Sequence, residues 1–286
     1  MYYTLPIFAT LLWAGNTIVS KLSSEVFSPI EISFYRWLLA FILITPFALM
    51  KVKDSWEEIV DKIPRLFILG VLGGVAYQGF AYYAAFYTTA TNMGIIQATM
   101  PVMSMLLAFT FLNTRFKILS VTGILLSILG VLMVVTRGNL HYFTSTGVNF
   151  GDVLMVIATF SFALYSFLLQ KWKMKMPVLV SIYLQALVAS FVLLPMFLLV
   201  DNKIDLTFNS FSLVMYAAIG ASIFAPLVWM MSIVKLGSER VSVFFNLIPV
   251  FITILATLLL KEPIDTIVIT GVVISVSGLV ISEVYR

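Results

Sequence analysis

Runs of about twenty apolar residues, separated by short charged or turn-forming clusters, follow one another along the whole chain. They cover residues 2–21, 29–50, 65–86, 92–112, 117–136, 152–170, 177–200, 211–234, 240–260 and 264–285. A helix needs roughly 20 mostly apolar residues to cross about 30 Å of hydrocarbon, and in lipid a helix satisfies its backbone hydrogen bonds internally. The pattern therefore predicts an all-α polytopic membrane protein with ten transmembrane helices and no room for a soluble domain.

The composition and the placement of charge exclude several classes of protein. Hydrophobic residues make up 61% of the chain and charged residues 10%, whereas an ordinary soluble domain has about 25% charged residues. The formal net charge is +4, but the basic residues form no single stripe, so we expect no nucleic-acid partner. The chain has no cysteine, which removes disulfides and thiolate metal ligands. We expect the lipid bilayer as a partner, with no metal and no cofactor.

The basic residues indicate how the helices are oriented, because Lys and Arg concentrate in cytoplasmic loops. Of the 17 Lys and Arg residues, only Lys21, Arg137, Lys203 and Lys261 fall on one side of the predicted helices, and Arg36 lies within a helix. The other twelve fall on the side that holds both ends of the chain. We therefore predict a multi-pass protein of a bacterial cytoplasmic (inner) membrane, with both termini in the cytoplasm.

An internal repeat divides the chain into two halves. A shift of 148 residues brings Pro101-Val102 onto Pro249-Val250 and brings the small residues of the fifth run onto those of the tenth. These small residues, which allow close helix packing, are Gly123, Ser127 and Gly130 in the fifth run and Gly271, Ser275 and Gly278 in the tenth. Each half, 1–148 and 149–286, then holds five helices, and because five is odd the second half crosses the membrane in the opposite sense. Such a 5+5 inverted repeat is typical of secondary transporters, although a duplication kept for packing alone stays open.

Three further stretches carry a resemblance to a known family. They are Leu11-Leu12-Trp13-Ala14-Gly15-Asn16, Phe34-Tyr35-Arg36-Trp37 and Leu260-Lys261-Glu262-Pro263. Together with the proline-containing runs and the repeat, they resemble the drug/metabolite transporter superfamily, specifically its ten-helix EamA-type branch, over essentially the whole chain. The sequence departs from that pattern at Ala14-Gly15 and at Asn113-Thr114. The resemblance implies one structural unit of two five-helix EamA-type repeats around a central cavity for a small-molecule substrate.

Polar and aromatic side chains within the apolar runs predict the lining of that cavity. A polar group finds no partner in lipid and therefore faces the protein interior or a water-filled cavity. By helical spacing, we expect the substrate-binding cavity to be lined by Trp13, Asn16, Tyr77, Gln78, Tyr82, Gln97, Phe162, Tyr165, Trp229 and Asn246. Ordinary contact with lipid or with the protein core stays an alternative for each aromatic residue. The mixture suits a small, partly apolar solute with a few hydrogen-bonding groups.

Four other residues inside the runs have a potential role in transport. Pro101, Pro249 and Pro226 each remove a helical hydrogen bond, so we expect kinks that act in gating, or bends that neighbouring helices tolerate. Arg36 is the only basic residue well inside a run. It could attract a substrate carboxylate or phosphate, or it could be a structural arginine, and the sequence leaves both roles open.

The residues argue against catalysis. The one histidine, His141, falls in a predicted outer loop, and no carboxylate lies deep in a run, so the pattern offers no acid, base or metal site. We expect a secondary transporter that moves a small organic metabolite, an amino acid or a similar neutral or zwitterionic solute, by alternating access, as export or exchange. A multidrug exporter and a non-transporting membrane scaffold are the alternatives. We expect a monomer or a homodimer.

Overall fold

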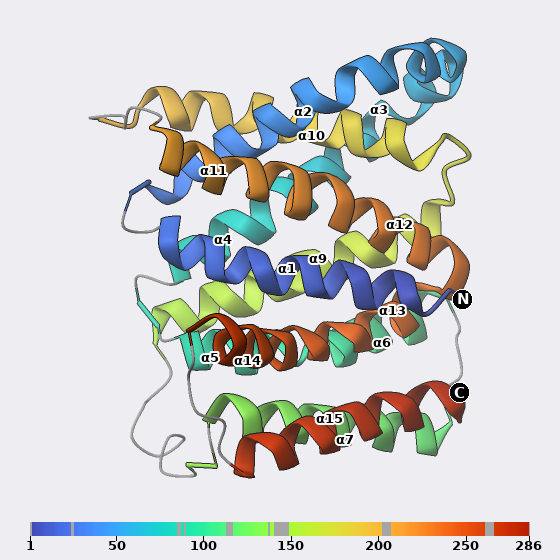
Figure 1. Cartoon of the computed structure of the whole chain (residues 1–286). Coiled ribbons are helices and arrows are strands. Elements are labelled where there is room, and N and C mark those ends of the chain that lie inside the picture. Colours follow the sequence, from blue (N-terminus) through green and yellow to red (C-terminus); the bar gives the residue numbers. More distant parts are fainter. Residues whose placement is uncertain are drawn as a thin grey trace. The chain divides into compact units, whose positions relative to one another are not determined.

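The structure, a computed structural model (Figure 1), describes residues 2–23, 26–84, 87–88, 90–112, 117–136, 138–139, 149–201, 207–260 and 266–285. Every regular element in these ranges is helical. The elements are α1 (Thr4–Ser23), α2 (Pro29–Asp54), α3 (Trp56–Gly70), η1 (Val71–Ala76), α4 (Tyr77–Ala84), α5 (Ala90–Gln97), α6 (Met100–Leu112), α7 (Ile118–Thr136), α9 (Phe150–Trp172), α10 (Val178–Leu198), α11 (Phe208–Tyr216), η2 (Ala217–Phe224), α12 (Ala225–Leu236), α13 (Ser238–Val243), η3 (Phe244–Asn246), α14 (Leu247–Leu260) and α15 (Thr266–Val284).

The helices account for the apolar runs of the sequence. Within the described ranges, eight helical segments are long and apolar enough to cross a membrane, and α1 contributes a shorter apolar stretch, Thr4–Val19. Each of the ten predicted runs overlaps a helix or a series of consecutive helices. The all-helical class and the multi-pass membrane character are thereby confirmed, while ten membrane crossings and the 5+5 repeat stay predictions.

By their internal contacts, the helices fall into two compact units. Unit 1 comprises Met1–Gly79 and Leu168–Lys235, and unit 2 comprises Phe80–Phe167 and Leu236–Arg286. Each unit therefore combines one segment from the first half of the chain with one from the second.

Unit 1 contains a pair of long antiparallel helices, α2 and α10. The ring of Phe34 stacks on that of Phe197 with centroids 4.3 Å apart, and the ring of Phe41 stacks on that of Tyr183 at 4.9 Å. Residue numbers increase along α2 while those of its contacts on α10 decrease, so the two helices run antiparallel. Trp37 joins this apolar cluster from α2. The stacked rings give close van der Waals packing, which is the kind of contact that holds helices together in lipid.

The start of α2 shows how local sequence fixes a helix end. Ser28 is the N-cap residue, and its hydroxyl accepts a hydrogen bond from the Glu31 backbone N–H. The Glu31 carboxylate in turn accepts from the Ser28 backbone N–H at 2.9 Å, and Pro29 follows the cap, where no N–H is needed. This capping box explains why the carboxylate of Glu31 is buried although it is charged, at the start of the run 29–50.

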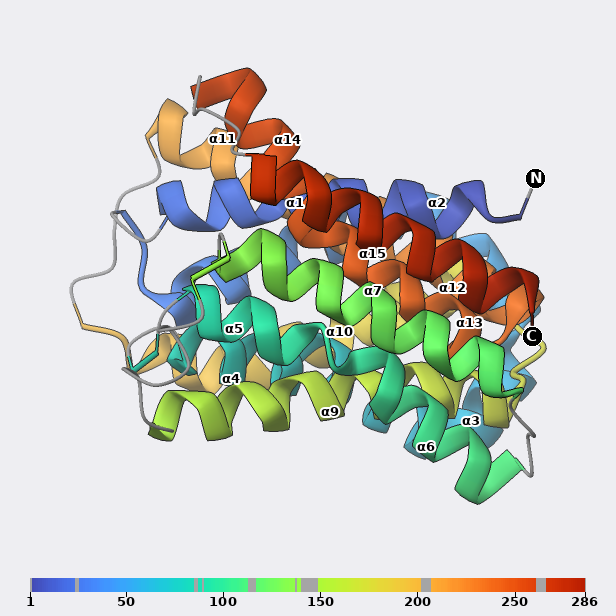
Figure 2. The same ribbon diagram turned by 90° about the horizontal axis from the view of Figure 1, so that it is seen from below.

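Unit 2 contains a second antiparallel pair, α7 and α15, which lie side by side in Figures 1 and 2. A Cβ added to Gly123 would lie 2.4 Å from the Ser282 backbone nitrogen, and one added to Gly130 would lie 2.3 Å from that of Ser275. The hydroxyls of Ser127 and Ser275 are 3.3 Å apart. The small residues of both helices therefore face each other, at backbone separations that only glycine permits.

Helical geometry is interrupted at two places in each unit. Unit 1 has two π-helices: η1 within the series α3–η1–α4, and η2 within the series α11–η2–α12. In unit 2, α5 ends at Gln97 just before α6, which begins at Met100, and the 3₁₀ turn η3 precedes α14. Wide or broken turns leave carbonyl oxygens without their usual intrahelical donors, which gives side chains a place to bind.

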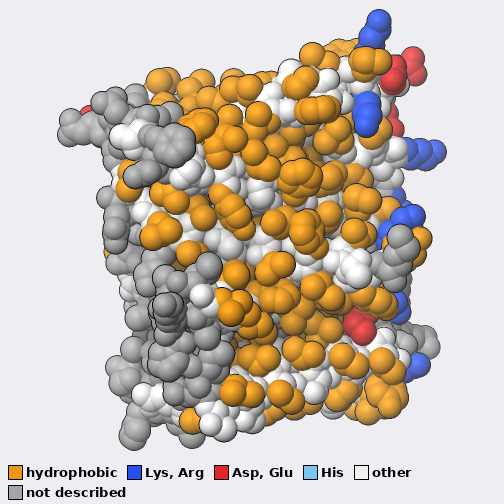
Figure 3. Space-filling view, viewed as in Figure 1, with side chains coloured by type: hydrophobic (Ala, Val, Ile, Leu, Met, Phe, Trp, Pro, Cys, Tyr) orange, Lys and Arg blue, Asp and Glu red, His pale blue; other side chains and the backbone are white. Residues whose placement is uncertain are grey.

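The outer surface of the helices is apolar. In unit 1, Phe47 on α2 and Phe191 on α10 are each 70% exposed. Figure 3 shows hydrophobic side chains along the helices and Lys and Arg side chains at one end of them. A surface of this kind suits hydrocarbon with charged residues at the headgroups, as expected for a protein that contacts the bilayer.

Candidate functional site

The most distinctive polar group of unit 1 is the guanidinium of Arg36, carried by α2. The residue is only 1% exposed. Its Nε–H donates to the hydroxyl of Ser222 in η2 at 2.7 Å, and its Nη1 donates to the side-chain carbonyl of Gln78 in α4 at 3.3 Å. We call Arg36, Gln78 and Ser222 the Arg36 cluster. It joins residues that lie 42 and 186 positions from Arg36 in the sequence.

Tryptophan side chains bind both π-helices beside the Arg36 cluster. The indole N–H of Trp37 donates to the carbonyl of Gly74 in η1 at 3.0 Å, and that of Trp13 donates to the carbonyl of Ala221 in η2 at 3.2 Å. The hydroxyl of Ser222 donates to the Ala217 carbonyl at 2.9 Å. Carbonyls released by the wide π turns thus find side-chain donors, and the two distorted helices are held in place around the arginine.

The charge of Arg36 is not neutralised by the residues that the structure describes. No carboxylate among them lies within ion-pair distance of the guanidinium, whose Cζ lies 5.7 Å from the centroid of the Trp37 ring. A guanidinium has five N–H donors, and two of them reach protein acceptors. A charged side chain at the centre of a membrane helix costs roughly 2.5–3.5 kcal/mol on insertion scales, so such residues usually mark functional sites.

The other predicted lining residues of unit 1 are distributed around Trp13. Its ring meets that of Trp229 edge to face, with centroids 5.2 Å apart, and Trp229 is buried. Asn16 is buried one turn further along α1, whereas Tyr77, at the start of α4, is half-buried. The structure thus brings Trp13 and Trp229 into contact.

Tyr216, at the end of α11 in unit 1, was missed by the reasoning from sequence. Its hydroxyl donates to the carbonyl of Leu12 at 3.1 Å, and a Cβ at Gly15 would fall 2.1 Å from that same hydroxyl. Gly15 is therefore required by the close approach of this tyrosine to α1. No pattern in the sequence pairs these residues, because the hydrogen-bond acceptor is a backbone carbonyl.

In unit 2, the predicted lining residues lie in two environments. Phe162 and Tyr165 are buried on α9 with ring centroids 5.4 Å apart, and Phe162 also meets Phe245 at 5.2 Å. Tyr82 and Gln97 are half-buried. The aromatic residues thus form part of a packed core within the unit, while Tyr82 and Gln97 keep partly accessible side chains.

Asn246 occupies a fully buried position in η3. Its exposure is 0%, and its amide Nδ2 donates to the hydroxyl of Ser127 at 3.0 Å, which lies 3.3 Å from that of Ser275. The Oδ1 atom of Asn246 has no hydrogen-bond partner in the described part of the chain. The structure therefore joins a predicted cavity residue to the small-residue faces for which the sequence suggested packing alone.

Each of the three singled-out prolines follows a disturbed turn. Pro101 is the second residue of α6, after the gap between α5 and α6, and Pro249 is the third residue of α14, after the 3₁₀ turn η3. Pro226 is the second residue of α12, directly after the π-helix η2. A proline cannot donate to the carbonyl four residues earlier, so the preceding turn departs from α geometry.

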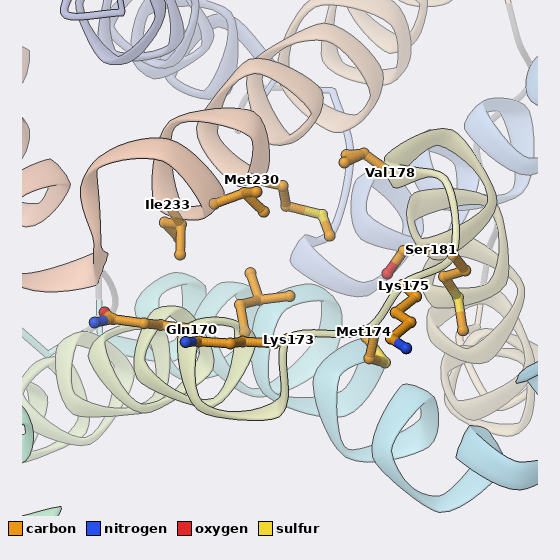
Figure 4. A pocket seen from close by; sticks show the side chains of 11 residues that line it. Gln170, Lys173, Met174, Lys175, Val178, Ser181, Met230 and Ile233 are labelled. Carbon is orange, nitrogen blue, oxygen red and sulfur yellow. The ribbon is translucent and has the colours of Figure 1, made fainter. Parts of the chain in front are cut away.

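A separate hollow of about 360 Å³ lies in unit 1, where α9 ends and α10 begins (Figure 4). The side chains around it are mainly apolar, with Lys173 and Lys175 at the rim and Met230 and Ile233 contributed by α12. Lys173 has a positive φ of 41°, which is uncommon for a residue with a side chain. None of the predicted site residues lines this hollow.

Comparison with known proteins identifies the family. The model of the EamA-like transporter family matches residues 1–136 and 149–283. The chain belongs to this family. It is a transmembrane transporter of the drug/metabolite type, as the sequence motifs indicated.

Two relatives and one solved structure are similar to this EamA-like transporter over most of their length. An uncharacterized transporter of Archaeoglobus fulgidus is 32% identical over 276 residues, which are 94% of this chain and 92% of the relative. The uncharacterized transporter YyaM of Bacillus subtilis is 22% identical over 272 residues, which are 93% of this chain and 88% of the relative. A crystal structure superimposes with a TM-score of 0.81 at 14% identity, over 99% of this chain and 96% of that one. This last likeness shows the fold alone.

Some predicted features lie outside the described residues. These are His141, the loop position Asn113-Thr114 and the motif residues Lys261, Glu262 and Pro263. Their roles stay predictions.

Proposed function

We propose that this EamA-like transporter moves a small organic metabolite, an amino acid or a similar neutral or zwitterionic solute, across the cytoplasmic membrane by alternating access, as export or exchange. The observation that carries this proposal is the buried guanidinium of Arg36, whose polar partners lie in the π-helix η2 and in α4 directly after the π-helix η1. Buried polar groups at distorted transmembrane helices mark substrate pathways in many transporters. The predicted lining residues are the proposed substrate-binding residues.

An inverted repeat of residues 1–148 and 149–286 is the proposed basis of alternation. Helices at equivalent places in the two halves pack against each other: α2 with α10 in unit 1, and α7 with α15 in unit 2. Both pairs are antiparallel, as two halves of opposite membrane orientation require. The family model also matches the chain in two stretches of nearly equal length. The three prolines beside disturbed turns are the proposed flexing points.

The chemistry of the Arg36 cluster favours a metabolite transporter over a multidrug exporter. An exporter of organic cations needs a membrane-buried carboxylate to attract its substrates. The Arg36 cluster instead presents a buried cation with amide and hydroxyl partners, and the buried carboxylate of Glu31 is engaged in the capping box at the start of α2. This arrangement repels cations, which argues against the multidrug alternative, and a scaffold has no need of a buried charge.

Solute flux across proteoliposomes tests the proposal. Purified full-length protein is reconstituted, and efflux of a panel of labelled amino acids and related metabolites is compared with that from protein-free liposomes. We expect saturable flux of at least one solute, reduced strongly by Gln97→Ala. The matched control is Thr270→Ala, an exposed residue of α15 whose hydroxyl donates to the Thr266 carbonyl of its own helix, and it should keep the wild-type affinity. Folded protein that moves no member of the panel would contradict the proposal.

A further inference from the structure

We infer that Arg36 binds the carboxylate of the transported solute, so that the substrates of this protein are organic carboxylates, including zwitterions, with an apolar portion. The inference rests on the proposed transport function and adds the substrate class. It starts from the burial of Arg36, which leaves 1% of the residue exposed. Among the described residues, the guanidinium meets a hydroxyl and an amide but no anion. A buried cation without a protein anion carries an uncompensated cost and marks a candidate functional site, and an anionic ligand would neutralise it.

The donor count of the guanidinium fits a carboxylate. Of its five N–H groups, the one on Nε donates to Ser222 and one on Nη1 donates to Gln78. Three N–H groups remain, distributed over both terminal nitrogens. A carboxylate binds two N–H groups of a guanidinium at once, in a fork that a lysine ammonium does not reproduce. The two protein contacts fix the plane of the guanidinium and use only two of its N–H groups, so enough donors remain for this fork.

The surroundings of Arg36 are those of a positioned ligand group rather than of a packing residue. Arg36 and Trp13 bind consecutive residues of η2, the Ser222 hydroxyl and the Ala221 carbonyl, so the guanidinium and an indole are held on the same distorted turn. If Arg36 served only to fill space and make two hydrogen bonds, an uncharged side chain would do the same. It would also avoid the cost of burying a charge. The half-buried indole of Trp13, held edge to face against the buried Trp229, is the apolar group proposed to contact the rest of the solute.

Binding to the full-length protein in lipid nanodiscs tests the inference with two simple probes. They are 4-methylpentanoate and 4-methylpentanamide, which share a branched apolar chain and differ only in the ionised carboxylate. Tryptophan fluorescence is the readout, because Trp37 adjoins the guanidinium. We expect a saturable response to the carboxylate, with an affinity at least tenfold greater than that for the amide.

Variants then assign the response to Arg36. We expect Arg36→Gln to lose at least tenfold in affinity for 4-methylpentanoate and Arg36→Lys to restore part of it. Arg65→Gln is the matched control, because Arg65 is a second arginine of unit 1 beside a tryptophan, 5.8 Å from the Trp172 ring centroid, and it should bind like the wild type. If Arg36→Gln fails to fold, Ser222→Ala keeps the charge and removes one contact that orients it. It should then weaken carboxylate binding more than amide binding.

The results separate this inference from the proposed function. Equal affinity for the two probes, no response to either, or wild-type binding by Arg36→Gln overturns the carboxylate assignment. The proposed function still stands if reconstituted protein moves solutes that lack a carboxylate. Conversely, carboxylate-selective binding that depends on Arg36, without flux of any solute, supports the inference and contradicts transport.

Discussion

The packing of α7 against α15 allows a quantitative prediction for a single methyl group. In Gly130→Ala, the new Cβ would lie 2.3 Å from the Ser275 backbone nitrogen and 2.5 Å from the Gly271 carbonyl oxygen. Ordinary contact begins near 3.4 Å, so the two helices must separate by about 1 Å. Overpacking of this kind costs about 1–3 kcal/mol. The same separation weakens the contact between the Ser127 and Ser275 hydroxyls, which adds about 0.6 kcal/mol in a membrane.

The control for this prediction is Gly79→Ala in α4. A Cβ at Gly79 meets no described atom within 4 Å, and alanine is favoured over glycine in a helix by roughly 0.5–1 kcal/mol. Denaturant unfolding in detergent micelles, followed by tryptophan fluorescence, measures both variants. After the same helix-propensity gain of roughly 0.5–1 kcal/mol is subtracted, we expect Gly130→Ala to lower the free energy of unfolding by about 1–3 kcal/mol and Gly79→Ala to leave it unchanged or slightly raised. Equal stability of the two variants would refute the close packing of α7 and α15.

Three further predictions address other parts of the molecule. Trp37→Phe removes the indole donor to the Gly74 carbonyl and should lower the free energy of unfolding by about 1–3 kcal/mol in the same assay; an unchanged value would show that the π-helix does not need this donor. For topology, a cysteine introduced at Ser145 should react with an impermeant thiol reagent in whole cells, whereas one at Ser55 should not, and the reverse pattern would reject cytoplasmic termini. Asn246→Ala removes a buried hydrogen bond and should reduce transport strongly while costing only about 1 kcal/mol of stability, so wild-type flux in a folded variant would exclude Asn246 from the transport site.

The sequence was sufficient for the helical class and the family, because both depend on the order of apolar runs and short motifs. It also located the small-residue faces that pack between α7 and α15, since repeated Gly and Ser positions at helical spacing have few other uses in a membrane. The π-helices could not be predicted in this way. The stretch Val71–Ala76 is as apolar as an ordinary transmembrane helix, and its altered hydrogen bonding leaves no periodic signal.

Side-chain partners were also beyond the sequence. Helical spacing placed Asn246 among polar residues of its run, but its contact with Ser127 depends on the close approach of α7, 119 positions away in the chain. The same holds for Arg36, whose partners Ser222 and Gln78 lie on other helices and are not paired with it by any pattern in the sequence. Contacts between distant helices decide what a polar residue does, and they are a property of tertiary packing.

Counterflow tests most directly whether this protein is an alternating-access transporter. Proteoliposomes loaded with an excess of an unlabelled solute from the flux panel are diluted into a trace of the same solute in labelled form. An alternating-access carrier returns with labelled solute after each outward step, so the account predicts a transient accumulation of label above its equilibrium level, absent from protein-free liposomes. Label that only rises to equilibrium, at the rate of a passive leak, would contradict the account.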